Sequence, residues 1–204
     1  MARRDTQPEK ALRIARKRGI ARARDFRAAG IALVTLKRLC DQGRLVRLAR
    51  GLYQLPEFQG AHAEHDLAQA ARLAPRGVIS LLSALRHHGL TTQLPHAVWL
   101  TLPRQTRKPK AAPFALEVTR ATGRALSAGI ERIEIEGVPV SIYGVAKTVA
   151  DCFKHRRRVG LDVAIEALRD AMRNRKTTPA EIWRYAAIDR VTNTIRPYLE
   201  ALSA

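Results

Sequence analysis

Three short segments near the N-terminal end carry apolar residues at helical spacing, and each segment is followed by a glycine. The segments cover residues 7–18, 21–29 and 32–42. A glycine directly after the last periodic residue is a common stop signal for a helix, and Pro8 suits the first turn of the first segment. The pattern therefore predicts three consecutive helices.

The pattern changes to short strand-like runs after the third predicted helix. Residues 45–48 and 52–55 are mostly apolar and are separated by the basic turn Ala49-Arg50-Gly51, which predicts a β-hairpin. The second and third predicted helices are joined by Gly30-Ile31, with Ile31 expected in the core. Two helices around such a turn are typical of a helix-turn-helix, and the following hairpin makes it winged.

The remainder of the chain mixes strand and helix patterns after a linker at residues 56–60. The predicted fold is α+β: an N-terminal winged helix-turn-helix, followed by a mixed α/β C-terminal domain with a small sheet and a helical C-terminal end. We place the DNA-binding domain at residues 1–56 and the C-terminal domain at 57–204. Strands are predicted at 97–102, 114–119, 130–136 and 138–143, and helices at 64–74, 81–88, 145–155, 161–175, 179–187 and 191–202. A further element, of no assigned type, begins at 78–80.

The charge of the chain points to a polyanionic partner. The 204 residues hold 37 Lys and Arg against 18 Asp and Glu, a net charge of +19. The first 60 residues hold 15 basic and 5 acidic residues, whereas the remaining 144 hold 22 and 13, so the basic excess is more than twice as dense at the N-terminal end. A field of this sign attracts nucleic acid, although an anionic membrane, an acidic protein or a merely solvated basic surface also fit the charge alone.

The third predicted helix is the candidate recognition helix, because the second helix of a helix-turn-helix enters the major groove. If Leu33, Leu36 and Cys40 face inward, the residues that face outward are Val34, Thr35, Lys37, Arg38 and Asp41. Arg can bind guanine O6 and N7, and Thr offers a hydroxyl and a methyl to base edges. Lys37 suits a phosphate.

Further arginines surround this helix. Arg47 and Arg50 are expected near the tip of the hairpin and Arg44 at its base, where they suit phosphates or the minor groove. A second basic loop is either a solvated loop or an extension of the nucleic-acid footprint. Its members are Arg104, Arg107, Lys108 and Lys110.

Other chemistry is weakly supported by the sequence. Cys40 and Cys152 lie in apolar helical patterns without metal-ligand spacing, so we expect free, buried thiols, no metal and no cofactor. Asp151 and Lys154 beside Glu117 and Glu134 would suit a metal-dependent nuclease, but no fixed spacing supports this, and we expect no enzyme. The chain has no run of about 18 apolar residues and no apolar signal-peptide core, so we expect a cytoplasmic protein without membrane contact.

Several motifs, in this order along the chain, resemble the AbiEi antitoxin family of type IV toxin–antitoxin systems. The N-terminal ones resemble the family's winged helix and the others its C-terminal domain, over roughly residues 20–170. They are Phe26-Arg-Ala-Ala-Gly-Ile31, Thr35-Leu-Lys-Arg-Leu39, Gly43-Arg-Leu-Val-Arg-Leu-Ala-Arg-Gly-Leu-Tyr53, Val78-Ile-Ser-Leu-Leu-Ser-Ala-Leu-Arg-His-His-Gly-Leu90, Val98-Trp-Leu-Thr-Leu-Pro103, Thr148-Val-Ala-Asp-Cys-Phe153 and Gly160-Leu-Asp-Val-Ala-Ile-Glu-Ala-Leu168. The chain departs from the pattern at Ala32, which stands where a Ser or Thr would cap the recognition helix.

The resemblance implies two activities linked to phage abortive infection. The N-terminal domain would bind inverted repeats in double-stranded DNA of its own promoter and repress the operon. The C-terminal domain would counteract a nucleotidyltransferase-like toxin, and a stable complex with that toxin is not assumed. A stand-alone winged-helix regulator without a toxin remains the alternative, and the oligomeric state, monomer or dimer, stays open.

Overall fold

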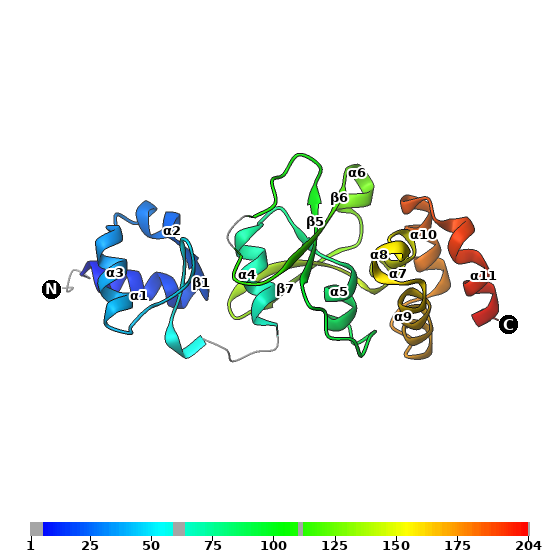
Figure 1. Ribbon diagram of the computed structural model, residues 1–204, viewed down its shortest axis with the longest axis horizontal. Coiled ribbons are helices and arrows are strands. Elements are labelled where there is room, and N and C mark those ends of the chain that lie inside the picture. The colour runs from blue at the N-terminus through cyan, green and yellow to red at the C-terminus, as the bar shows by residue number, and fades with distance from the viewer. Residues whose placement is uncertain (1–5, 59–63, 110–111, 204) are drawn as a thin grey trace. The chain divides into compact units, whose positions relative to one another are not determined.

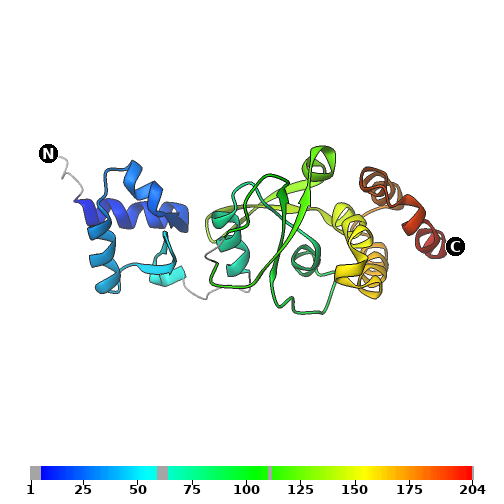
Figure 2. The ribbon, with the colours of Figure 1, turned by 45° about the horizontal axis from the view of Figure 1, so that its top comes forward.

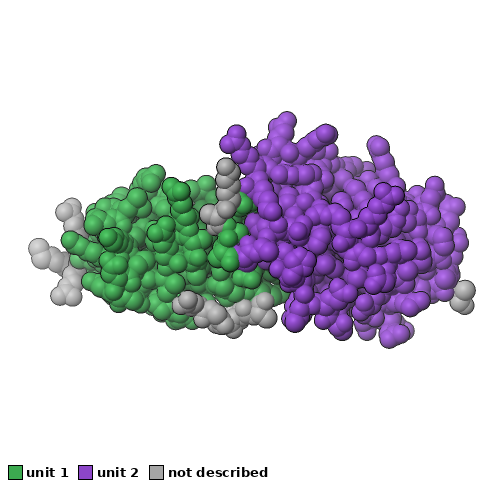
Figure 3. Space-filling model, viewed as in Figure 1, with its two compact units in different colours: residues 1–75, 109–113, 134–140 green, residues 76–108, 114–133, 141–204 purple. Residues whose placement is uncertain are grey.

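The computed structural model describes residues 6–58, 64–109 and 112–203, and divides the chain into two compact units (Figure 1). Unit 1 comprises residues 1–75, 109–113 and 134–140, and unit 2 comprises 76–108, 114–133 and 141–204, as coloured in Figure 3. Among the described residues, no helix combines the length and the apolar character that a membrane crossing needs.

Unit 1 contains the predicted winged helix-turn-helix. Its helices are α1 (Gln7–Arg18), α2 (Ala23–Ala28) and α3 (Leu33–Asp41), and its hairpin strands are β2 (Val46–Ala49) and β3 (Leu52–Gln54). A short 3-10 helix (Pro56–Phe58) and α4 (His65–Leu73) follow.

One prediction for unit 1 is wrong. The second helix was expected to begin at residue 21, but residues 20–22 form a strand and the helix begins at Ala23. This strand, β1 (Ile20–Arg22), pairs antiparallel with β3, and Ala21 lies opposite Tyr53. The sheet therefore has three strands in the order β1-β3-β2. Ile20 and Ala21 are both fully buried, which a strand covered by a helix layer satisfies better than one exposed turn of helix.

The core of unit 1 is small and lies under the three helices. Phe26 is fully buried and meets Tyr53 edge to face, with ring centroids 5.7 Å apart. Ile31, in the turn of the helix-turn-helix, is 3% exposed, which confirms its predicted place in the core. The other buried members of this core are Ala11, Ala15, Ala21, Leu36, Leu39, Leu45 and Leu55.

Gly19 marks a close approach within unit 1. Its φ of +61° lies in the left-handed region that favours glycine, and a Cβ at this position would collide with the carbonyl oxygen of Glu136. Glu136 itself is held by two donors, Gln54 Nε2 at 3.0 Å and His65 Nδ1 at 2.8 Å from its Oε2.

Unit 2 contains most of a five-stranded mixed sheet in the order β6-β5-β4-β8-β7, whose β7–β8 turn groups with unit 1. The sheet confirms the four strand segments predicted from the sequence. Its fifth strand, β4, lies where an element of no assigned type was expected, and a short helix, α6 (Gly123–Ser127), was not predicted. Strands β5 and β6 run parallel, whereas β4 pairs antiparallel with β5 and parallel with β8. The elements are β4 (Val78–Ile79), α5 (Leu81–His87), β5 (Val98–Pro103), β6 (Leu116–Ala121), α6, β7 (Ile130–Ile135) and β8 (Val138–Tyr143).

The C-terminal part of unit 2 is helical, as predicted, and its helices pack together in both views (Figures 1 and 2). Thr178 caps α10: its Oγ1 accepts from the Glu181 N–H at 3.2 Å, and the Glu181 carboxylate accepts from the Thr178 N–H at 3.1 Å. The helices are α7 (Val145–Lys154), α8 (Arg156–Val159), α9 (Leu161–Arg173), α10 (Pro179–Asp189) and α11 (Thr192–Ser203).

The start of α3 is capped from outside its own sequence. Ala32 supplies no side-chain cap. Instead Gln7, at the start of α1, accepts hydrogen bonds at its Oε1 from the Ala32 N–H at 3.4 Å and from the Thr35 hydroxyl at 3.0 Å. Its Nε2 donates to the Gly30 carbonyl at 3.4 Å, so one glutamine side chain joins α1 to both ends of the helix-turn-helix turn.

We therefore expect Gln7→Ala to lower the free energy of unfolding by about 1 kcal/mol, as loss of an N-cap does. Chemical denaturation followed by circular dichroism measures the change. Gln105→Ala, at an exposed loop position of unit 2, is the control and should leave stability unchanged. Equal stability of both variants would show that the Gln7 contacts do not hold the start of α3.

Candidate nucleic-acid interface

Helix α3 presents one continuous exposed face. Leu36 and Leu39 are buried beneath it, whereas Lys37, Arg38 and Asp41 are exposed. At about 100° per residue, positions 33, 34, 37, 38 and 41 fall within an arc of about 140° on the side opposite Leu39. The helix therefore offers side chains from at least two turns to a partner.

The expected inward position of Leu33 is wrong, since 51% of this residue is exposed. Leu36 and Leu39 are the residues of α3 that join the core, together with Ile31 and Phe26. Leu33 lies about 120° around the helix from Leu39, on the exposed arc with Lys37 and Arg38. Cys40, the other residue expected inward, is only half-buried, and burial raises the pKa of its thiol, with Asp41 adding to the shift.

The three candidate residues of α3 do not share one environment. Lys37 and Arg38 are exposed and lie on the free face. Thr35 is half-buried, and its hydroxyl donates to Gln7 Oε1. Its position lies about 100° from that of Leu36 and about 60° from that of Arg38 around the helix, at the edge of the exposed face.

The hairpin after α3 carries the three predicted arginines in exposed positions. Arg44 precedes β2, Arg47 lies on β2 opposite Tyr53, and Arg50 lies in the turn. Gly51 closes the turn with φ of +78°. The register shifts between Arg47 and Ala49, a bulge that increases the local twist of the ribbon.

The second basic loop lies in the segment after β5. Arg104 and Arg107 are exposed, and Lys108 is exposed as a residue while its Nζ donates to the Leu116 carbonyl at 2.8 Å. Lys110 lies outside the described residues. Arg120 of β6 donates to the carbonyls of Pro103 and Thr106, which holds the start of this loop in place.

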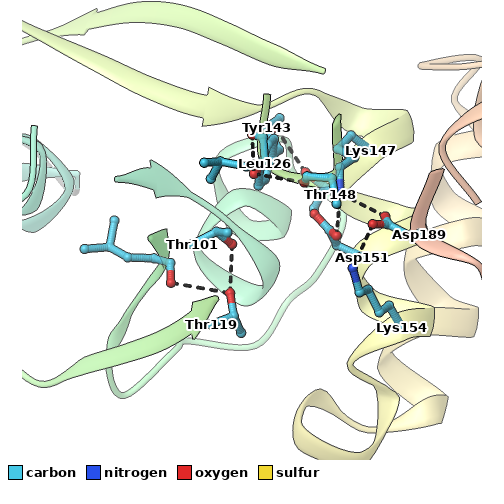
Figure 4. A network of polar contacts seen from close by, with 11 residues as sticks. Thr101, Thr119, Leu126, Tyr143, Lys147, Thr148, Asp151, Lys154 and Asp189 are labelled. Atoms are coloured by element: carbon cyan, nitrogen blue, oxygen red, sulfur yellow. Dashed lines mark hydrogen bonds and ion pairs between the residues drawn. The ribbon is translucent and has the colours of Figure 1, made fainter. Parts of the chain in front are cut away.

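A buried ionic network lies between α7 and α10 of unit 2 (Figure 4). Lys147, only 1% exposed, lies with its Nζ 2.5 Å from Asp151 Oδ1 and 2.8 Å from Asp189 Oδ2. Lys154 Nζ lies 3.0 Å from Asp189 Oδ1. Two cations thus face two carboxylates, and the pairing offsets the desolvation that burial imposes on each charge.

Further hydrogen bonds join this network to the sheet. The Tyr143 hydroxyl donates to the Leu126 carbonyl at 2.8 Å, and the Thr148 hydroxyl donates to the Tyr143 carbonyl at 3.0 Å. Lys147 Nζ also lies 4.8 Å from the centroid of the Tyr143 ring. Burial raises the pKa of Tyr143, and the nearby Asp151 and Asp189 add to the shift.

The residues considered for a nuclease have other partners in unit 2. Glu117 Oε2 lies 2.5 Å from Arg158 Nη2. Asp151 and Lys154 are connected through Lys147 and Asp189, and Asp189 was not considered from the sequence. Within the described part of the chain, no group of three or more His, Cys, Asp or Glu side chains is arranged to hold a metal ion.

In a comparison with known protein families, the segment that carries α3 and the hairpin matches a family model. Residues 9–56 match the family model described as "Transcriptional regulator, AbiEi antitoxin". The N-terminal segment is therefore similar to the AbiEi family of regulators. This confirms the resemblance over those residues, from the middle of the first turn of α1 to the end of the hairpin.

The other comparisons add little to the AbiEi-type assignment. No curated protein matches the chain significantly. Among solved structures, the chain is similar to the crystal structure of the RV2827C protein from Mycobacterium tuberculosis. The identity is 16%, the alignment covers 92% of this chain and 83% of that one, and the TM-score is 0.43.

Three residues around these sites have roles that were not predicted from the sequence. Gln7 caps α3 from 25 residues away, and no local pattern signals such a contact. Asp189 ends α10, far along the chain from the lysines it pairs with. Val34 was expected on the outer face of the helix but was given no role. An apolar residue on an exposed helical face is itself a sign of a binding surface.

The titration of Asp151 gives a testable consequence. Burial raises its pKa to about 7, although Lys147 opposes the shift. The folded protein therefore binds more protons than the unfolded chain between about pH 4 and pH 7. The contribution of this carboxyl group to stability is largest below that range and is lost as the pH rises through it.

We expect the stability difference between the wild type and Asp151→Asn to shrink as the pH rises from 4 to 7. Urea denaturation of both proteins across this range measures it. Glu200→Gln, which changes an exposed carboxylate of α11, should give a difference that does not follow this course. A difference for Asp151→Asn that grows with pH would mean that the folded state favours the ionised carboxylate.

Proposed function

We propose that this protein is the antitoxin of a type IV toxin–antitoxin system. It binds inverted repeats in its own promoter as an autorepressor and counteracts a nucleotidyltransferase-like toxin. It acts in the cytoplasm without membrane contact, cofactor or enzymatic activity. The AbiEi-type match over residues 9–56 and the basic excess of the N-terminal segment support the regulatory part of this proposal.

The observation that carries the proposal is the exposed face of α3 beside the arginines of the hairpin. Lys37 and Arg38 are free to approach a duplex, and α3 is the second helix of the helix-turn-helix, which enters the major groove in such domains. An exposed recognition helix with an adjacent basic hairpin suits double-stranded DNA better than it suits a flat protein surface.

We assign the contacts by the chemistry of each side chain. Arg38 binds the guanine edge through its planar guanidinium, and Lys37 neutralises a phosphate. Thr35 reaches a base edge only if its hydroxyl leaves Gln7, so its main contribution is to fix the start of α3. Arg44, Arg47 and Arg50 bind the backbone or the minor groove along the hairpin.

We propose a division of labour along the chain. Residues 1–56 bind DNA, and residues 57–204 counteract the toxin, for which a stable complex is not required. The loop of Arg104, Arg107, Lys108 and Lys110 adds a second nucleic-acid contact. A monomer on each half-site and a dimer across both are compatible with this assignment.

Co-expression with the neighbouring gene tests the proposal. Growth and promoter activity are scored together, and the antitoxin should restore growth while repressing the shared promoter. Repression without any effect on growth would favour a stand-alone winged-helix regulator. Magnesium-dependent cutting of DNA by the purified protein, abolished in Asp151→Ala, would favour a nuclease instead.

Arg38→Ala should weaken binding to operator DNA by about 1–3 kcal/mol and relax the base preference at one position. The reason is the loss of a bidentate contact to a base edge. Fluorescence anisotropy with operator duplexes carrying single base changes measures both effects. Arg173→Ala, an exposed arginine near the end of α9, is the control and should change neither.

Arg50→Ala should weaken binding to every sequence by the same factor, because a phosphate contact carries no sequence information. The slope of log K against log salt should become flatter by about one unit. Titrations at several salt concentrations, on operator and random duplexes, measure this change. A loss confined to the operator would place Arg50 on a base instead.

A further inference from the structure

Two adjacent apolar side chains on α3 are left without a partner in the fold. Leu33 is 51% exposed and Val34 is 58% exposed, in the first turn of the helix. Burying a side chain of this size in the core stabilises a protein by about 1.5–3 kcal/mol. Leu33 and Val34, being largely exposed, do not contribute this free energy in full. With Ala32 before them, they make the whole first turn of α3 apolar on its exposed side.

The apolar pair lies on the same face as the cations assigned to DNA. Val34 and Arg38 are four residues apart, and so are Leu33 and Lys37, so each apolar residue lies one turn before a basic one. The two turns are separated by about 6 Å along the helix axis, within the reach of neighbouring base pairs. The cap that a Ser or Thr would provide comes instead from Gln7, so no polar side chain interrupts the apolar turn.

Leu and Val can distinguish bases in only one way in the major groove. Neither side chain donates or accepts a hydrogen bond, and the C5 methyl of thymine is the apolar group that the major groove presents. The residues at the N-terminal end of a recognition helix are the ones that contact base edges. A polar base edge placed against Leu33 or Val34 would lose its hydrating water and gain no hydrogen bond in return, which is unfavourable.

We propose that Leu33 and Val34 recognise thymine methyl groups in the operator, next to the guanine that Arg38 contacts. The inference rests on the proposed DNA-binding function and specifies its sequence preference: thymines at the positions faced by the first turn of α3. The flanking Lys37 and Arg38 favour a duplex over a protein partner for this face, because an apolar protein surface would have to cover both charges as well.

The test uses the full-length protein and duplexes that it selects from a random-sequence library. In a selected duplex, single thymines are replaced by deoxyuridine, which removes the methyl group and keeps every hydrogen bond. At one or two positions per half-site the wild type should bind about three- to fivefold more weakly, the loss expected for one methyl group. The Leu33→Ala/Val34→Ala variant should bind thymine and uracil duplexes equally at those positions.

Two controls separate the outcomes. Leu94→Ala, at a 75%-exposed position of unit 2, should keep the full sensitivity to uracil. Thermal unfolding of the double variant should match the wild type, because both side chains are exposed.

Equal binding of thymine and uracil duplexes by the wild type would overturn this inference alone. If no duplex is enriched, DNA binding itself is refuted. Loss of self-association in the double variant, with no methyl effect, would assign the pair to a contact between two copies.

Discussion

Burial of Leu36 and Leu39 beneath α3 sets the orientation on which the interface depends. With these two leucines in the core, the helical period leaves no choice about which residues face outward, and Lys37 and Arg38 come to the free side with Leu33 and Val34. The core that holds them is narrow. Ala11 and Ala15 of α1 are both fully buried, and their small side chains let the first helix approach closely. Rotating α3 by one residue would expose a leucine and bury a cation, so packing and charge favour the same arrangement.

The two units solve the problem of buried polarity differently. In unit 1, one amide side chain, that of Gln7, satisfies backbone and hydroxyl groups at the turn of the helix-turn-helix. In unit 2, full charges are enclosed between α7 and α10, where Lys147 bridges two aspartates. The desolvation of buried charges offsets much of their attraction, so such a network adds little net stability. The Gln7 contacts hold the start of the exposed helix α3 in place, and the ionic network fixes the packing of α7 against α10.

The sequence predicted the elements of this chain well where a local pattern decides them. The first helix, the hairpin, the sheet strands and the C-terminal helices follow from periodicity and from glycine or proline signals, and the AbiEi resemblance is confirmed over residues 9–56. The strand β1 was missed because three residues carry no period, and its pairing with β3 is decided by a partner about 30 residues away. Leu33 was misplaced because a helix of nine residues offers several apolar arcs, and tertiary packing, which buries Leu36 and Leu39, chooses among them. Asp189 could not be found because ion pairs between helices depend on tertiary packing.

The crowding at Gly19 has an evolutionary consequence. Residues 19 and 136 are more than a hundred positions apart, yet the backbone of one occupies the space that a side chain on the other would need. Position 19 therefore cannot change by itself: any larger residue there requires the 136 backbone to move, and with it the carboxylate held by Gln54 and His65. Position 19 is therefore closed to every other amino acid unless the backbone at residue 136 moves.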